Sequence, residues 1–215
     1  MYYKDRYKIG FDKTPSGLLE RYSMSVIPGS SQSLVSMLAD SLSKLDDQLV
    51  KDCGIKSIGF EDLGPSKEYY PNHGYYVNDT LILNSKLPED MQVFKDPTTG
   101  KICNRFEHTL FHELGHGWDA VKKDLSVKPE WLELSGWSEK PVNGKVRIEI
   151  KEKGSPDMFG EWCYDPEAKF VRFYARRNPW DDFADTFSFY VAGLLGFVPE
   201  NKAAYLSAKI GAKNV

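Results

Sequence analysis

Cysteine is scarce in this chain. Its 215 residues contain three cysteines, Cys53, Cys103 and Cys163, and no pair of them has C-x-x-C spacing. An odd number of scattered cysteines argues against a disulfide framework, and none of the three has the spacing of a zinc ligand. We therefore expect three reduced thiols, in the core or on the surface.

Long apolar runs and a strong net charge are also missing. No run of about 18 apolar residues occurs, so the sequence predicts no membrane-spanning helix. The formal net charge is -3, because 28 Lys and Arg residues stand against 31 Asp and Glu residues. This balance supplies no basic face of the kind that nucleic-acid binding needs. We therefore expect neither a membrane nor a nucleic acid as a partner.

The N-terminal residues Met1 to Arg6 contain no apolar segment like that of a signal peptide. We therefore expect a cytoplasmic protein, or one that is delivered or secreted by a route without a conventional signal.

The overall composition is that of a globular protein, with 41% hydrophobic, 13% aromatic and 27% charged residues. At this length we expect a single domain, residues 1–215, of the α+β class. The long mixed segment at about 122–172 is interpreted as an insertion of loops and a β-hairpin. Since connections of this length are commonly functional, we expect a functional loop here.

Hydrophobic spacing predicts the elements upstream of that insertion. Apolar residues at intervals of three and four predict a helix over 31–50, and an alternating pattern predicts a strand over 54–60. Two short strands, at 75–77 and 80–83, flank Asn78-Asp79, which is typical of a tight hairpin turn. An edge strand in this hairpin, near Thr80 to Leu83, could hold an extended peptide by main-chain hydrogen bonds.

The stretch from Phe106 to Val121 contains His112-Glu113-Leu114-Gly115-His116, an H-E-x-x-H pattern that Asn104 can precede as a helix cap. In a helix the two histidines lie one turn apart and can direct ring nitrogens at one ion, with Glu113 beside them to move protons. This pattern is typical of zinc hydrolases. We predict one Zn2+ per chain, with His112 and His116 as ligands and Glu113 as the general base.

The rest of this helix has two faces. At about 100° per residue, its apolar residues gather on one side and its histidines on the other, so one face can enter the core while the other lines a cleft. The alternative is an ordinary amphipathic helix with solvated histidines. His108 is also four residues from His112, but Thr109 occupies the place of the glutamate in that register. We therefore expect His108 to be exposed and not to be a ligand.

Two histidines leave a catalytic zinc one protein ligand short, and the sequence from Asn178 to Asp185 offers three carboxylates. Asn178 suits a helix N-cap and Pro179 a first turn, so we predict a helix from here to about Leu195. On that helix Asp181 borders the apolar face, Asp185 lies further out and Asp182 points to solvent. Helical geometry thus ranks Asp181 first. The alternative is that these acids only stabilise the helix N-terminus.

Tyr174 precedes Asp181 by seven residues, in Y-A-R-R-N-P-W-D-D-F-A-D-T-F. Together with H-E-L-G-H, this segment resembles the gluzincin metalloproteases related to anthrax lethal factor and the Pro-Pro endopeptidases, in which a Tyr stands seven residues before an E-F-F-A-E-like segment. The resemblance covers roughly a third of the chain. It implies a zincin-like metalloprotease domain, with a small mixed sheet and an edge hairpin packed on the H-E-L-G-H helix, and a C-terminal helix that carries the third ligand.

Residue by residue, the resemblance implies that His112, His116 and Asp181 bind zinc and that Glu113 is the general base. Tyr174 would hydrogen-bond the oxyanion, and Asp185 would hydrogen-bond a zinc histidine. The family has Glu where this chain has Asp181 and Asp185. A side chain one methylene shorter needs its helix about 1 Å closer to the metal, or the metal is bound more weakly.

The function expected from these residues is that of a zinc endopeptidase, which hydrolyses a specific protein target bound extended along an edge strand. The toxin-like relatives suggest a delivered effector. Two alternatives remain open: a catalytically weak or inactive zinc-binding domain that holds a partner peptide on its edge strand, and a hydrolase of non-peptide amides.

Overall fold

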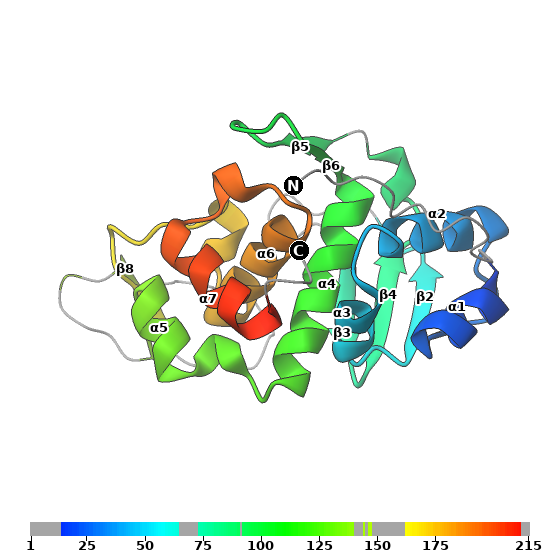
Figure 1. The fold of residues 1–215 in the computed structure, drawn as a ribbon, viewed down its shortest axis with the longest axis horizontal. Coiled ribbons are helices and arrows are strands. Elements are labelled where there is room, and N and C mark those ends of the chain that lie inside the picture. The colour runs from blue at the N-terminus through cyan, green and yellow to red at the C-terminus, as the bar shows by residue number, and fades with distance from the viewer. Residues whose placement is uncertain are drawn as a thin grey trace.

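The computed structural model describes residues 14–64, 73–90, 92–139, 144, 146–147 and 162–211. Over these residues the chain is a mixed α+β fold with seven α-helices and a small mixed sheet, which confirms the predicted class. Figure 1 shows the sheet and the N-terminal helices on one side of helix α4 (Arg105–Val121), and the C-terminal helices on its other side. Helix α4 therefore joins the two halves of the molecule.

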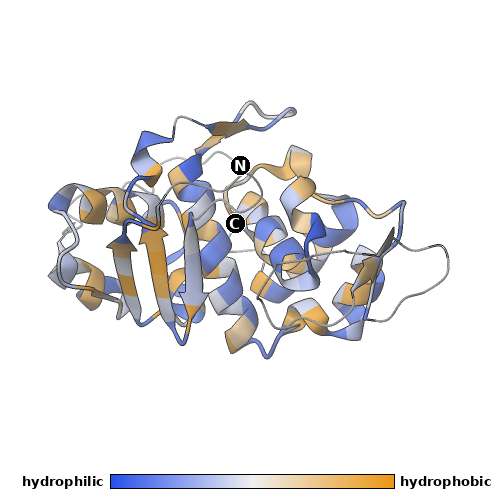
Figure 2. Ribbon diagram, turned by 180° about the vertical axis from the view of Figure 1, so that it is seen from behind, coloured by the Kyte–Doolittle hydropathy of each residue, from blue (hydrophilic) through white to orange (hydrophobic). Residues whose placement is uncertain are grey.

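The main sheet has the strand order β1-β2-β4-β3. Strands β1 (Ser25–Val26), β2 (Ser57–Glu61) and β4 (Thr80–Asn84) run parallel, while β3 (Gly74–Val77) pairs antiparallel with β4. Strand β4 is buried along four successive residues, as expected for a strand covered on both faces, whereas burial in β3 alternates. Figure 2 accordingly shows β4 as hydrophobic along most of its length and β3 as paler.

The hairpin predicted around Asn78-Asp79 is confirmed, because β3 and β4 pair across that turn. Asn78 and Asp79 have φ angles of 48° and 59°, the left-handed values that this kind of two-residue turn requires. The position expected for the edge strand was wrong. Strand β4 is enclosed between β2 and β3, so among the described strands the edge of the sheet on this side is β3, which packs against α4.

Three helices precede or follow the first strands: α1 (Pro15–Tyr22), α2 (Gln32–Leu42) and α3 (Asp47–Asp52). The single helix expected over 31–50 is therefore two helices. The break has a local cause, because the side chain of Asp46 accepts the backbone N–H of Gln48 at 2.9 Å and so starts α3. Both helices bury leucines in the core shared with α4.

The C-terminal half consists of helices, short 3-10 turns and small sheets. Its longest helix, α6, begins at the predicted Pro179 and ends at Val191, four residues before the predicted end. Gly193 then turns the chain with a φ of 70°.

The remaining elements of the described chain are β5 (Val93–Lys95), β6 (Ile102–Asn104), α5 (Pro129–Ser135), β7 (Trp137–Ser138), β8 (Val146–Arg147), β9 (Cys163–Tyr164) and α7 (Glu200–Ile210), with 3-10 turns η1 (Leu87–Glu89), η2 (Leu125–Val127), η3 (Phe173–Arg176) and η4 (Leu195–Phe197).

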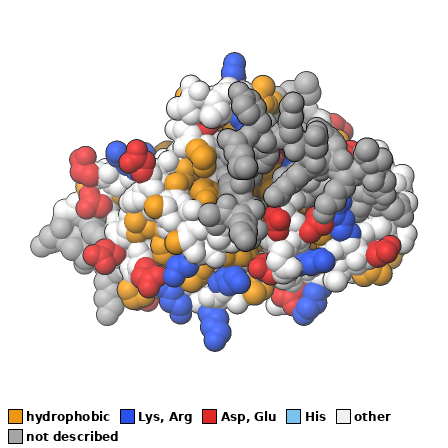
Figure 3. All heavy atoms as spheres, viewed as in Figure 1, with side chains coloured by type: hydrophobic (Ala, Val, Ile, Leu, Met, Phe, Trp, Pro, Cys, Tyr) orange, Lys and Arg blue, Asp and Glu red, His pale blue; other side chains and the backbone are white. Residues whose placement is uncertain are grey.

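The described parts of the predicted insertion at 122–172 contain η2, α5 and a three-stranded sheet with the order β7-β9-β8. Much of the β-hairpin and of the loops expected there falls on residues 140–143, 145 and 148–161, which lie outside the described residues. Within the described part, no helix combines the length and the apolar character that a bilayer crossing requires. Figure 3 shows acidic and basic side chains interspersed over the visible face, in keeping with the small net charge.

The expectation that Asp182 points to solvent was wrong. Its side chain is fully buried and accepts hydrogen bonds from Lys202 Nζ at 2.7 and 2.8 Å and from Trp137 Nε1 at 3.0 Å. The physical reason is the position of α6, which is covered by α4 on one side and by α7 on the other, as Figure 1 shows. The face of α6 opposite its contact with α4 is therefore also part of the core.

Lys202 is 1% exposed, and its charge lies 4.7 Å from the Phe170 ring centroid as well as against Asp182. We predict that Lys202→Met lowers the free energy of unfolding by about 3–5 kcal/mol, because removing one partner leaves a buried carboxylate without its cation. Urea denaturation followed by circular dichroism measures this loss. The matched control is Lys209→Met on the same helix, whose ion pair with Glu130 is exposed and should contribute less than about 1 kcal/mol. Equal effects of the two substitutions would contradict the prediction.

Candidate metal centre

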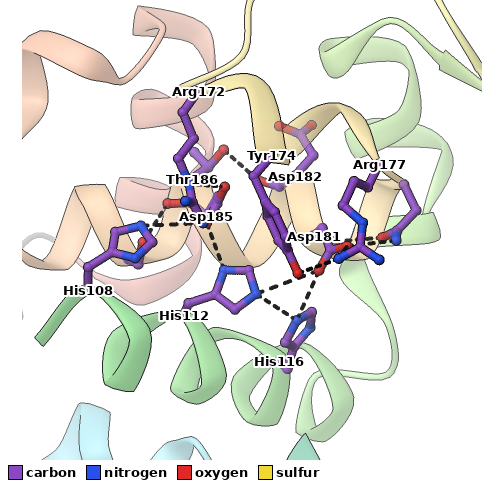
Figure 4. A network of polar contacts seen from close by, with 12 residues as sticks. His108, His112, His116, Arg172, Tyr174, Arg177, Asp181, Asp182, Asp185 and Thr186 are labelled. Carbon is purple, nitrogen blue, oxygen red and sulfur yellow. Dashed lines mark hydrogen bonds and ion pairs between the residues drawn. The ribbon is translucent and has the colours of Figure 1, made fainter. Parts of the chain in front are cut away.

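Helix α4 carries the two histidines and is capped as the sequence predicted. Asn104 Oδ1 accepts the backbone N–H of Glu107 at 2.8 Å, which satisfies one of the free donors at the helix start. The helix then continues unbroken to Val121, so His112 and His116 lie one turn apart on the face turned toward α6 (Figure 4).

Helix α6 brings a carboxylate to the same place. Asn178 caps this helix by accepting the backbone N–H of Asp181 at 2.7 Å, and Pro179 occupies its first turn. The side-chain amide of Asn178 also donates to Asp181 Oδ2 at 2.8 Å. One residue therefore starts the helix and orients the carboxylate, leaving Asp181 Oδ1 directed at the histidines.

Three ligand atoms converge at this point. The Nε2 atoms of His112 and His116 are 3.1 Å apart, and Asp181 Oδ1 lies 3.6 Å from the first and 3.5 Å from the second. A tetrahedral zinc with bonds of about 2.0–2.1 Å separates its ligand atoms by about 3.3–3.4 Å. These spacings therefore fit a metal ion. Among the described residues, His112, His116 and Asp181 form the group that could hold one.

The close approach of α4 and α6 depends on a residue inside the H-E-L-G-H motif. A Cβ atom added at Gly115 would lie 3.0 Å from the Cα of Ala184 and 3.2 Å from its carbonyl oxygen. Only glycine allows the two backbones to come this near without displacing one of them. The short separation gives a physical reason why an aspartate, rather than a longer glutamate, reaches the two histidines at position 181.

Asp185 lies behind His112, as the resemblance implied for it. Its Oδ1 accepts from His112 Nδ1 at 2.8 Å, so Nδ1 keeps a proton and Nε2 is the nitrogen that faces the ligand group. Arg172, which the sequence analysis did not single out, donates to both carboxylate oxygens of Asp185, each at 2.7 Å. Arg172 precedes η3, and nothing in its spacing from Asp185 indicated this contact.

Glu113 and Tyr174 complete the residues proposed for chemistry. Glu113 is 6% exposed beside His112 on α4, and burial raises the pKa of its carboxyl group. Tyr174 comes from η3, and its ring centroid lies 5.8 Å from that of His112. Burial also raises the pKa of the Tyr174 hydroxyl, which therefore keeps its proton and can act as a hydrogen-bond donor.

The expectation that His108 is exposed was wrong. It is 2% exposed, and its ring centroid lies 4.5 Å from that of Phe94 and 5.1 Å from that of Phe189. Strand β5 of the β5–β6 hairpin supplies Phe94 and so covers this part of α4, which a helical wheel alone does not reveal. His108 Nε2 has no hydrogen-bond partner among the described residues and lies 3.6 Å from Asp185, outside the ligand group.

Burial and neighbouring charges shift the pKa values of the ligand group in opposite directions. Burial alone would lower the pKa of His112, but Asp185 and Asp181 raise it to about 10. The two carboxylates show the reverse, since the histidines hold the pKa of Asp181 well below its usual range and Arg172 does the same for Asp185, against the effect of burial. Both carboxylates are therefore kept ionised, and a pKa of about 10 means that a cation bound at His112 Nε2 must displace a proton from that nitrogen.

Comparison of the chain with protein-family models, with curated proteins and with solved structures found no match. The case for a function therefore depends on the geometry of the site itself.

We predict that Arg172→Gln weakens the binding of a metal ion, with Zn2+ as the probe, about 10- to 100-fold, because Asp185 would lose the partner that fixes its carboxylate against His112. Competition with a fluorescent zinc chelator measures the affinity. The matched control is Arg176→Gln, because Arg176 lies in the same segment but is exposed and stacks on Phe170 and Phe173. Unchanged affinity in Arg172→Gln would show that the arginine does not support the ligand.

We also predict that Asp181→Glu binds a metal ion, with Zn2+ as the probe, more weakly than the wild-type chain. The Oδ1 atom of Asp181 already lies 3.5–3.6 Å from the histidine nitrogens, so an extra methylene would displace the carboxylate, and metal sites lose affinity when a ligand moves by about 0.5 Å. The same competition assay applies, with Asp40→Glu on the exposed face of α2 as the control for the chemical change. Tighter binding by Asp181→Glu would mean that the helix spacing does not select aspartate.

Proposed function

We propose that this chain is a zinc-dependent endopeptidase with a zincin-like arrangement of α4, α6 and the sheet. The observation that carries the proposal is the triangle formed by His112, His116 and Asp181, with Tyr174 beside it (Figure 4). Glu113 follows His112 on α4 and interacts electrostatically with both histidines. Two imidazoles and one carboxylate suit zinc, and three protein ligands are typical of a catalytic site, because a structural site normally has four.

The residues around the ligand group can divide the work of hydrolysis. Bound zinc would supply Lewis acidity, which favours ionisation of water and polarises a peptide carbonyl. Glu113 takes a proton from the attacking water as the new C–O bond forms, and gives that proton to the leaving amine as the C–N bond breaks. Tyr174 donates its hydroxyl proton in a hydrogen bond to the oxyanion that forms on the carbonyl oxygen.

The substrate proposed is an extended peptide along strand β3. This strand is the edge of the main sheet beside α4, and its Tyr75 and Val77 are 42% and 47% exposed. An edge strand can bind an extended chain through main-chain hydrogen bonds, while alternate side chains provide specificity. A protein target is therefore the class of substrate that this surface supports.

The proposal predicts different losses for two substitutions. Glu113→Gln should keep about one zinc per chain but lose cleavage by about 10²- to 10⁴-fold, because the general base is removed and the ligands remain. His112→Ala should lose both zinc and cleavage. Metal analysis combined with a mixed peptide library read by mass spectrometry measures both properties.

Cleavage by Glu113→Gln at the wild-type rate would overturn the mechanism. Zinc bound by all proteins except His112→Ala, without cleavage by any of them, would favour the alternative of a zinc-binding domain that holds a peptide on β3. Release of small products from purified cell-wall material instead of peptides would identify a hydrolase of non-peptide amides.

A further inference from the structure

Tyr174 lies between two arginines. The guanidinium carbons of Arg172 and Arg177 are each 4.7 Å from the centroid of the Tyr174 ring. Figure 4 shows the ring between the two side chains, with its hydroxyl end near Asp181 and Arg177. The two arginines have different tasks, because Arg172 pairs with the carboxylate of Asp185 on the far side of His112.

Arg177 instead contacts the reactive end of the tyrosine. Its Nη1 donates a hydrogen bond to Tyr174 Oη at 2.5 Å. The same nitrogen lies 3.8 Å from Asp181 Oδ2, beyond hydrogen-bond distance, and that oxygen already accepts from Asn178 at 2.8 Å. The contact with Tyr174 is therefore the closer and better-formed interaction of Arg177 in the site.

A hydroxyl that accepts a hydrogen bond from a cation becomes a stronger donor, because the two bonds polarise each other. The accepted bond also occupies one lone pair of Oη, so the hydroxyl proton must turn away from Arg177. Since the hydroxyl end of Tyr174 faces the ligand group, its proton is available to an oxygen atom bound there (Figure 4).

We propose that Arg177 is a positioning residue that acts through Tyr174, so that the Arg177–Tyr174 pair, and not the tyrosine alone, donates to the oxyanion of the peptide substrate. This inference rests on the proposed function. It differs from a role for Arg177 in holding Asp181, because a support for the ligand would change metal affinity, whereas a support for Tyr174 changes the rate at unchanged metal content.

The test uses the full-length, zinc-loaded chain and four substitutions: Tyr174→Phe, Arg177→Met, the double variant and Arg177→Lys. Arg177→Met should keep the wild-type zinc content and KM but lower kcat about 10- to 100-fold, less than the loss of about 10²- to 10³-fold expected for removing the donor itself in Tyr174→Phe. The double variant should be no slower than Tyr174→Phe. Arg177→Lys, which keeps a cationic donor, should recover part of the rate.

Arg176→Met is the matched control, because this neighbouring arginine stacks on Phe170 and Phe173 instead of Tyr174. It should cleave at the wild-type rate. Independent, multiplying losses in the double variant would overturn the inference, as would a loss of zinc in Arg177→Met or a rate equal to that of the wild type.

A second readout does not depend on turnover. Acetohydroxamate offers an oxygen acceptor beside the metal, and its dissociation constant is measured from the visible spectrum of the cobalt-loaded protein. Arg177→Met and Tyr174→Phe should each weaken binding about tenfold, without a further loss in the double variant. If the wild-type chain cleaves no peptide, the proposed function fails. The same losses of acetohydroxamate binding would then still support the Arg177–Tyr174 donor pair. Unaltered acetohydroxamate binding in Arg177→Met, or no metal bound by the wild type, would overturn the pair.

Discussion

The spacing between α4 and α6 is the constraint on which the rest of the site depends. Helix α4 supplies both histidines and Glu113, and α6 supplies Asp181 and Asp185, so the distance between the two backbones decides whether the ligand atoms meet. Gly115 sets that distance against Ala184. A motif residue that takes no part in the chemistry thus permits the close approach of the two helices on which the ligand group depends.

One turn of α6 carries three aspartates with three separate tasks. Asp181 faces the histidine nitrogens, Asp185 accepts from the other side of His112, and Asp182 pairs with Lys202 in the core. At about 100° per residue, Asp182 is turned away from Asp181 toward α7, whereas Asp181 and Asp185 lie about 40° apart and face different nitrogens of His112. The candidate site and the packing of the C-terminal helix are consequently fixed by the same short segment, and support for the carboxylates comes from both sides of α6.

Features set by neighbours in sequence could be predicted. The caps at Asn104 and Asn178 and the turn at Asn78-Asp79 follow from local hydrogen bonds and backbone angles. Helix geometry alone ranked Asp181 first as the third ligand, and Asp181 is the carboxylate that the structure groups with His112 and His116. Features that depend on distant segments could not. His108 and Asp182 were placed at the surface because a helical wheel assumes one buried face, whereas hairpin β5–β6 and helix α7 cover the other sides. The pairing of Arg172 with Asp185 and that of Arg177 with Tyr174 likewise arise only when η3 packs beside α6.

The two hydrogen bonds between Asn178 and Asp181 also restrict the conformational entropy of Asp181. An aspartate has one rotatable side-chain bond fewer than a glutamate, and both its backbone N–H and its Oδ2 are already held by Asn178. A ligand with so little freedom left has little to lose when it is immobilised on an ion. The shorter carboxylate therefore offsets its limited reach by being ordered in advance, an advantage that a longer and less restrained side chain at the same position would not have.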